Sequence, residues 1–273
     1  MDFSTISGGG PGMAALGLIL AGVVAGLAAG TLGVGGGIVL VPALYLVLGD
    51  FGVAEGSRLA LAAGTGFAVM IPAALAAADV HRKAGTLDFA FVKRRALPAG
   101  IGAALGGAAL CVAPRIAPVS AFAAVALFSA VLLFAVKDGR AWLKRPPGRW
   151  ADALLGLFGG FTGIGASPLA APGWALSAAE PLKAEGAAAA LDALIGAVGA
   201  LILVGLGWGA RGLPDYSYGY VNLAAFAVAA PAMFLAATFT APLSATLKAS
   251  RLRKVFALFV LVSAGNLIWT ALG

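Results

Sequence analysis

The 273-residue sequence is 61% hydrophobic and only 11% charged, with a mean hydropathy of +1.00. A soluble domain carries about 25% charged residues, so this chain lacks the polar side chains that would cover a soluble surface. The net charge of +7 comes from basic residues clustered between apolar segments, which indicates membrane topology and not nucleic-acid binding.

A helix needs about 20 apolar residues to cross a bilayer, and eight apolar blocks follow one another along this chain. They are 13–49, 57–78, 90–112, 117–136, 151–179, 186–209, 220–243 and 255–272. The first block is too long for one simple span, and the glycine run 33–37 interrupts it. The fifth block is interrupted at 163–168. We therefore expect an all-α, polytopic membrane helix bundle in which these two blocks are broken into hairpins.

The two interrupted blocks belong to an internal repeat. Segment 33–42 matches segment 163–172 at an offset of 130 residues. Segment 85–89 then matches segment 219–223 at an offset of 134 residues. This collinear order predicts a first transmembrane repeat over 1–136, a basic polar linker over 137–150 and a second transmembrane repeat over 151–273.

The basic residues indicate how the repeats are oriented. If both interrupted blocks are hairpins, the loops 82–95, 137–149 and 248–254 share one side of the membrane and hold fourteen of the eighteen Lys and Arg residues. The other side is then assigned Arg58, Arg115, Lys183 and Arg211. The positive-inside rule favours this split over the eleven-to-seven split that eight simple crossings would give. We expect two inverted repeats of five segments each, in a cell (inner or plasma) membrane.

The two helix breaks are the strongest candidates for a functional site. Irregular backbone inside a membrane is tolerated only where it is buried or lines a wet cavity, and paired interruptions in inverted repeats are typical of transporter binding sites. The free N–H groups at the start of a half-helix favour an anion. In the second break, Ser167 stands at the expected N-cap and Pro168 at the first helical position. Close packing of small residues is the alternative explanation of the glycines.

The predicted substrate-binding residues at the breaks are Gly33, Gly35, Gly36, Gly37, Gly163, Gly165, Ala166, Ser167 and Pro168. Thr65 is added because it lies three residues past the position aligned with Asp192 and could donate to a substrate, although a hydrogen bond to its own helix is the commoner role of a lone Thr.

Asp192 and His81 are the candidates for proton coupling. Asp192 lies deep inside the sixth block, where a charged carboxylate is costly, so it either carries a proton or makes a structural hydrogen bond. His81 could titrate near neutral pH, although its basic loop favours a solvated interfacial histidine. The sequence contains no metal-ligand cluster, nucleotide-binding fingerprint or nucleophile triad. We therefore expect no metal, no cofactor and no enzymatic activity.

The stretch 27–48, with its glycine run and Pro42, resembles the signature of the sulfite exporter TauE/SafE family. The stretch 81–89 resembles the family's His-x-x-x-Gly-x-x-Asp pattern through His81, Gly85 and Asp88. The likeness covers nearly the whole chain and departs at 166–168, where family members often repeat Gly-Gly-Gly. It implies a secondary transporter that exports a small sulfur-containing anion, such as sulfite or an organosulfonate. An anion channel, or an importer of another small anion, is the alternative on the same scaffold. The expected partners are a small anion and the lipid bilayer.

Overall fold

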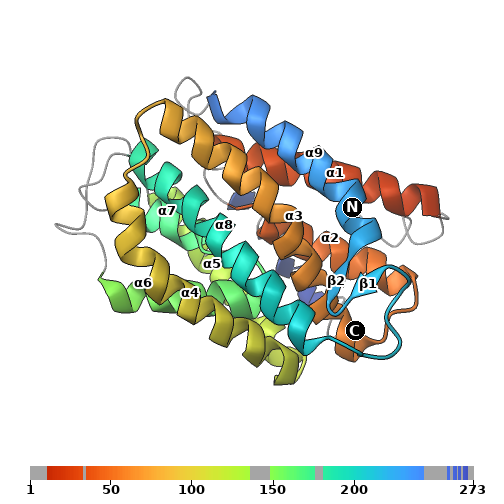
Figure 1. Cartoon of the computed structure of the whole chain (residues 1–273). Helices are drawn as coiled ribbons and strands as arrows, with labels where there is room; N and C mark the ends of the chain where they lie inside the picture. Colours follow the sequence, from red (N-terminus) through yellow and green to blue (C-terminus); the bar gives the residue numbers. More distant parts are fainter. Residues whose placement is uncertain are drawn as a thin grey trace.

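The computed structural model describes residues 11–32, 35–135, 148–175 and 181–242, and in the last block 257–258, 261–262, 264–265 and 267–269. Its elements, shown in Figure 1, are α1 (Pro11–Leu32), α2 (Gly37–Asp50), α3 (Glu55–Lys83), α4 (Phe89–Val112), α5 (Ile116–Ala135), α6 (Arg149–Thr162), α7 (Ser167–Ala175), α8 (Pro181–Leu206), β1 (Ser217–Tyr218), β2 (Val221–Asn222) and α9 (Leu223–Thr240). The expected all-α bundle is confirmed. The short antiparallel hairpin β1–β2, which pairs Ser217 with Asn222, is a local departure from it.

Five of the described helices, α1, α3, α4, α8 and α9, are long and apolar enough to cross a membrane. Large apolar side chains remain exposed along them, as a lipid-facing surface requires. Two of these helices begin with the same cap. The Asp88 carboxylate accepts the Phe91 N–H (3.0 Å) at the start of α4, and the Asn222 amide oxygen accepts the Ala225 N–H (2.9 Å) at the start of α9.

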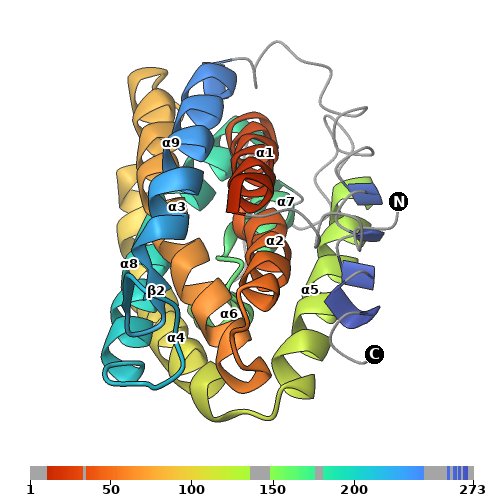
Figure 2. The same cartoon turned by 90° about the vertical axis from the view of Figure 1, so that its right-hand side faces the viewer.

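The helices form layers in which α3 and α8 lie between two tightly packed pairs, α1 with α9 and α4 with α6 (Figure 1). Glycines at four-residue spacing allow the outer pairs to approach closely. A Cβ atom at Gly26 of α1 would lie 2.4 Å from the Met233 carbonyl oxygen of α9. A Cβ atom at Gly106 of α4 would lie 2.1 Å from the Leu157 carbonyl oxygen of α6. Figure 2 shows α5 on the opposite side of the bundle from α3 and α8, with α2 and α7 between them.

Both interrupted blocks are broken, as the sequence predicts. One break separates α1 from α2, and the other separates α6 from α7. In the second break, Gly163 (φ 80°) and Gly165 (φ 84°) adopt the left-handed conformation that ends a helix and that side chains with a Cβ atom disfavour. The two breaks touch each other, because a Cβ atom at Gly37 would lie 2.6 Å from the Cα atom of Ile164. Gly33, Val34 and most of the basic linker lie outside the described residues.

The central helices α3 and α8 are antiparallel. Gly186, near the start of α8, packs on His81 near the end of α3, whereas Gly64, near the start of α3, packs on Leu203 near the end of α8. Lys183 therefore lies at the end of the bundle that also holds the Arg82 region, and its assignment to the opposite side was wrong. The physical reason is that α6 and α7 form a hairpin, which returns the chain to the end of the bundle that holds Arg82 before α8 begins. The inversion of the two halves across a membrane stays a prediction.

Candidate functional site

The two helix breaks meet a buried carboxylate near the middle of α8. Asp192 Oδ1 accepts the backbone N–H groups of Ala166 (2.8 Å) and Ser167 (3.0 Å). The Ser167 hydroxyl donates to Asp192 Oδ2 and accepts the N–H of Gly35 from the other break. Ser167 and Asp192 are both buried. A continuous hydrogen-bonded chain thus joins the first break, the second break and α8.

The start of α7 explains why a carboxylate binds there. The Ala166 carbonyl accepts the N–H groups of Leu169 (3.1 Å) and Ala170 (2.9 Å), so Ala166 is the N-cap and Ser167 the first helical residue. The predicted cap at Ser167 was therefore wrong by one residue, and Pro168 is the second helical residue. The N–H groups of Ala166 and Ser167 precede the first intrahelical bonds and need an acceptor from outside the helix. Asp192 supplies that acceptor, and the positive end of the α7 dipole stabilises the negative charge of its carboxylate.

Gly35 and Gly165 border the carboxylate itself. A Cβ atom at Gly35 would lie 2.3 Å from Asp192 Oδ2, and one at Gly165 would lie 2.7 Å from Asp192 Oδ1. Gly36 instead faces Met233, whose Cε atom would lie 2.3 Å from an added Cβ atom. Gly37 and Gly163 face neighbouring elements of the core. Close packing therefore accounts for some of the glycines at the breaks, while Gly35 and Gly165 leave room for the carboxylate.

A cavity of about 10 Å³ adjoins Asp192. Its walls come from α1, α3, α8 and α9 and from the first helix break. They are formed by Ala29, Gly35, Gly36, Met70, Ala74, Ala77, Ala189, Asp192 and Met233. This volume is about that of one water molecule. The charged residue among those that line the cavity is Asp192, which is anionic. Hydrogen bonds to an anion at this place would therefore come from backbone N–H groups and from the Ser167 hydroxyl. In this closed arrangement a small oxyanion does not fit beside the carboxylate.

The profile of the family described as "Sulfite exporter TauE/SafE" matches residues 18–267. The chain belongs to this family. It is 28% identical over 253 residues to a protein of Haemophilus influenzae described as a probable membrane transporter protein, and the alignment covers 91% of this chain and 96% of that relative. No solved structure matches the chain. The molecule is thus a multi-pass membrane transporter of the TauE/SafE type.

Two further candidates in the transporter lie away from the cavity lining. Thr65 Oγ1 accepts the N–H of Asn222 (2.9 Å), so this buried hydroxyl ties α3 to the start of α9. His81 is only 5% exposed, and the expectation of a solvated histidine was wrong. The turn after α3 folds back over it, with Thr86 Oγ1 2.9 Å from His81 Nδ1 and donating to the His81 carbonyl oxygen (3.1 Å). Gly186 of α8 covers the His81 side chain as well.

Two polar contacts important for this arrangement were not predicted. The Ser129 hydroxyl of α5 donates to the Pro168 carbonyl oxygen (2.6 Å) and anchors the start of α7. Ser129 lies in the middle of an apolar block whose other polar residue, Ser120, is near its start, and this position is the sequence signal that could have identified it. Arg95 of α4 forms a buried ion pair with Asp152 of α6, and its guanidinium lies over the ring of Trp174 (5.1 Å to the centroid). In the part of the chain that the structure describes, no group of three or more His, Cys, Asp or Glu residues could hold a metal ion.

Proposed function

We propose that this transporter exports a small sulfur-containing anion, sulfite or an organosulfonate, by alternating access around the meeting point of the two helix breaks. The observation that carries the proposal is that the Asp192 carboxylate accepts the N–H groups of both Ala166 and Ser167. This helix N-terminus therefore already binds an oxyanion group. Sulfite and sulfonates present oxygen acceptors of the same kind, and the family to which the chain belongs favours a sulfur oxyanion.

Neutral donors suit such a substrate. An anion that leaves water for the interior of a membrane protein needs charges or hydrogen bonds to replace its hydration. None of the residues that line the cavity is cationic. Backbone N–H groups and the dipole of α7 supply the attraction instead, at roughly 0.5–2 kcal/mol for the dipole. A site without a fixed cation also releases its anion more readily, which turnover requires.

The substrate and the Asp192 carboxylate compete for the same amides. Two unit negative charges about 4 Å apart repel each other by about 4 kcal/mol at an effective dielectric constant of 20. Asp192 must therefore move away or bind a proton when the anion enters. We propose that it binds a proton, because a neutral carboxyl group can remain beside the substrate and donate a hydrogen bond to it. Export would then be coupled to proton movement.

The cavity of about 10 Å³ is too small for the substrate, so binding needs a conformational change. The breaks lead directly into the short half-helices α2 and α7. Displacement of these two half-helices would therefore enlarge the cavity. The closed cavity also favours a transporter over the alternative of an anion channel. Saturable, gradient-driven flux is the behaviour expected of the transporter, whereas high single-channel conductance would indicate the channel.

Flux measurements in proteoliposomes test the proposal. A pH gradient should drive accumulation of labelled sulfite by the parent protein. Asp192→Asn should abolish accumulation against the gradient but retain binding and downhill exchange, because the neutral amide, like a protonated carboxyl group, does not repel the anion. The matched control is Asp88→Asn, since asparagine already caps α9 at the corresponding position of the second half. If Asp192→Asn still concentrates the anion, Asp192 does not carry the coupling proton.

A further inference from the structure

A second cavity, of about 750 Å³, lies at the basic end of the bundle between the starts of α4 and α6. Four cations line it, Lys93, Arg94, Arg95 and Arg149, together with Asp88 and Asp152. Arg95 is already paired with Asp152. Within the described ranges, no carboxylate forms an ion pair with Lys93, Arg94 or Arg149. This cavity therefore offers three cations whose charge is available to a ligand.

The cavity lies where membrane meets water. Trp150, which follows Arg149, is 87% exposed, as is typical of a tryptophan that anchors a protein at the headgroup level. Leu97 lines the cavity and begins an exposed apolar stripe on α4 that continues through Ile101 and Leu105. Residues spaced by four lie on one helix face, so the stripe runs from the cavity along the membrane-spanning part of α4.

We propose that this cavity binds the phosphate headgroup of an anionic phospholipid, with its acyl chains along Leu97, Ile101 and Leu105. Lys and Arg bind phosphate oxygens through charge-assisted hydrogen bonds. Basic pockets between membrane helices are suited to anionic headgroups, and a volume of 750 Å³ is within the range of small-ligand sites. A free anion would use the cations alone, whereas a lipid uses both the cations and the adjoining apolar stripe. A lipid bound there would stabilise the packing of α4 against α6. This site is independent of the anion site at the helix breaks.

Thermal unfolding of the purified protein in a neutral detergent tests this site. Short-chain phosphatidylglycerol should raise the unfolding midpoint of the parent, and phosphatidylcholine with the same chains and free glycerol phosphate should not. Lys93→Gln/Arg94→Gln should raise the half-maximal phosphatidylglycerol concentration about 30-fold, the effect expected for two interfacial cations near an anionic lipid.

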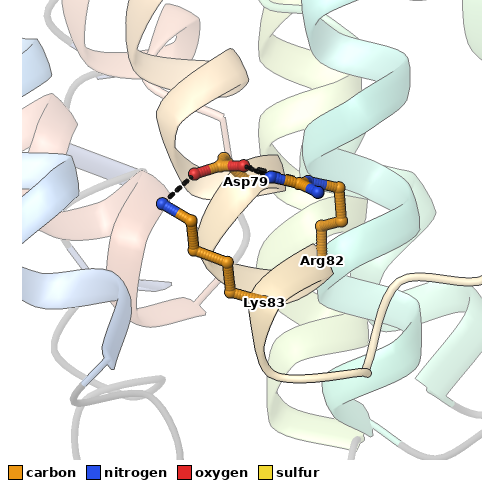
Figure 3. Close-up of polar contacts among 3 residues, drawn as sticks. All are labelled: Asp79, Arg82 and Lys83. Carbon is orange, nitrogen blue, oxygen red and sulfur yellow. Dashed lines mark hydrogen bonds and ion pairs between the residues drawn. The ribbon is translucent and has the colours of Figure 1, made fainter.

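The same end of the molecule provides a matched control. Arg82 and Lys83 already bind Asp79, at 2.6 Å each (Figure 3). Neither residue lines the cavity. Arg82→Gln/Lys83→Gln removes the same charge and should leave the half-maximal concentration within about twofold of the parent.

The single variant Arg149→Gln gives an independent measurement if the cavity double variant does not fold. It should weaken the response to phosphatidylglycerol about fivefold. Equal losses in the two double variants would mean that general surface charge attracts the lipid, which would overturn the proposal. A response to glycerol phosphate equal to that for phosphatidylglycerol would overturn it as well, because the site would then bind a free anion.

Discussion

Replacing Asp192 with alanine should convert the internal carboxylate site into a site for added anions. In the parent, one carboxylate accepts the N–H groups of Ala166 and Ser167 and the Ser167 hydroxyl. The substitution leaves three buried donors without this acceptor, and each such loss costs about 1–3 kcal/mol. Removal of the costly buried carboxylate offsets part of that loss. We therefore expect Asp192→Ala to lower the free energy of unfolding by about 2–5 kcal/mol.

Formate should restore this stability, because it has the same carboxylate group that the substitution removes. The space left by that group adds to the adjoining cavity of about 10 Å³. A ligand at 100 times its dissociation constant stabilises the native state by about 2.7 kcal/mol. Formate and sulfite should therefore raise the unfolding temperature of Asp192→Ala. They should raise that of the parent much less, since its own carboxylate already occupies the amides.

The assay is thermal unfolding in detergent with formate, sulfite or chloride at equal ionic strength. Ser129→Ala is the matched control, because it removes a buried hydrogen bond at the start of α7 and leaves Asp192 on its amides. This control should be destabilised without being rescued by formate. If formate and sulfite shift Asp192→Ala no more than Ser129→Ala, the N–H groups at the start of α7 do not form an anion site.

Two further predictions concern the first break and the topology. Gly35→Ala would place a Cβ atom 2.3 Å from Asp192 Oδ2, so we expect it to destabilise the protein by about 1–3 kcal/mol and to abolish sulfite transport. Gly173→Ala, whose Cβ atom would meet nothing within 4 Å, should behave like the parent in the same unfolding and flux assays. Wild-type flux in Gly35→Ala would show that the break tolerates a side chain. In a background without the native cysteine, single cysteines at Lys83 and Arg211 should be labelled by a membrane-impermeant reagent from opposite sides, and labelling from one side would refute the predicted orientation.

Several features of this protein follow from local sequence alone. Long apolar blocks can satisfy their backbone hydrogen bonds in a bilayer only as helices, which determined the all-α bundle. The positions of the two breaks also followed from sequence, because glycines such as Gly163 and Gly165 adopt a left-handed backbone that interrupts a helix. The cap at Asp88 and its counterpart at Asn222 are local contacts of the same kind.

Contacts between distant segments were decided only by the tertiary structure. Nothing in the sequence near Ser167 indicates that Asp192, 25 residues away, is the acceptor for its N–H group. That contact depends on how α8 packs against α7. The hydrogen bond from the Gly35 N–H to the Ser167 hydroxyl likewise joins segments that lie far apart in the chain. Burial of His81 likewise depends on the packing of Gly186 of α8 against it. The start of a helix can be predicted from sequence. The group that accepts its free N–H groups is decided by packing, because a hydrogen bond requires its two atoms to lie within about 3 Å whatever their separation along the chain.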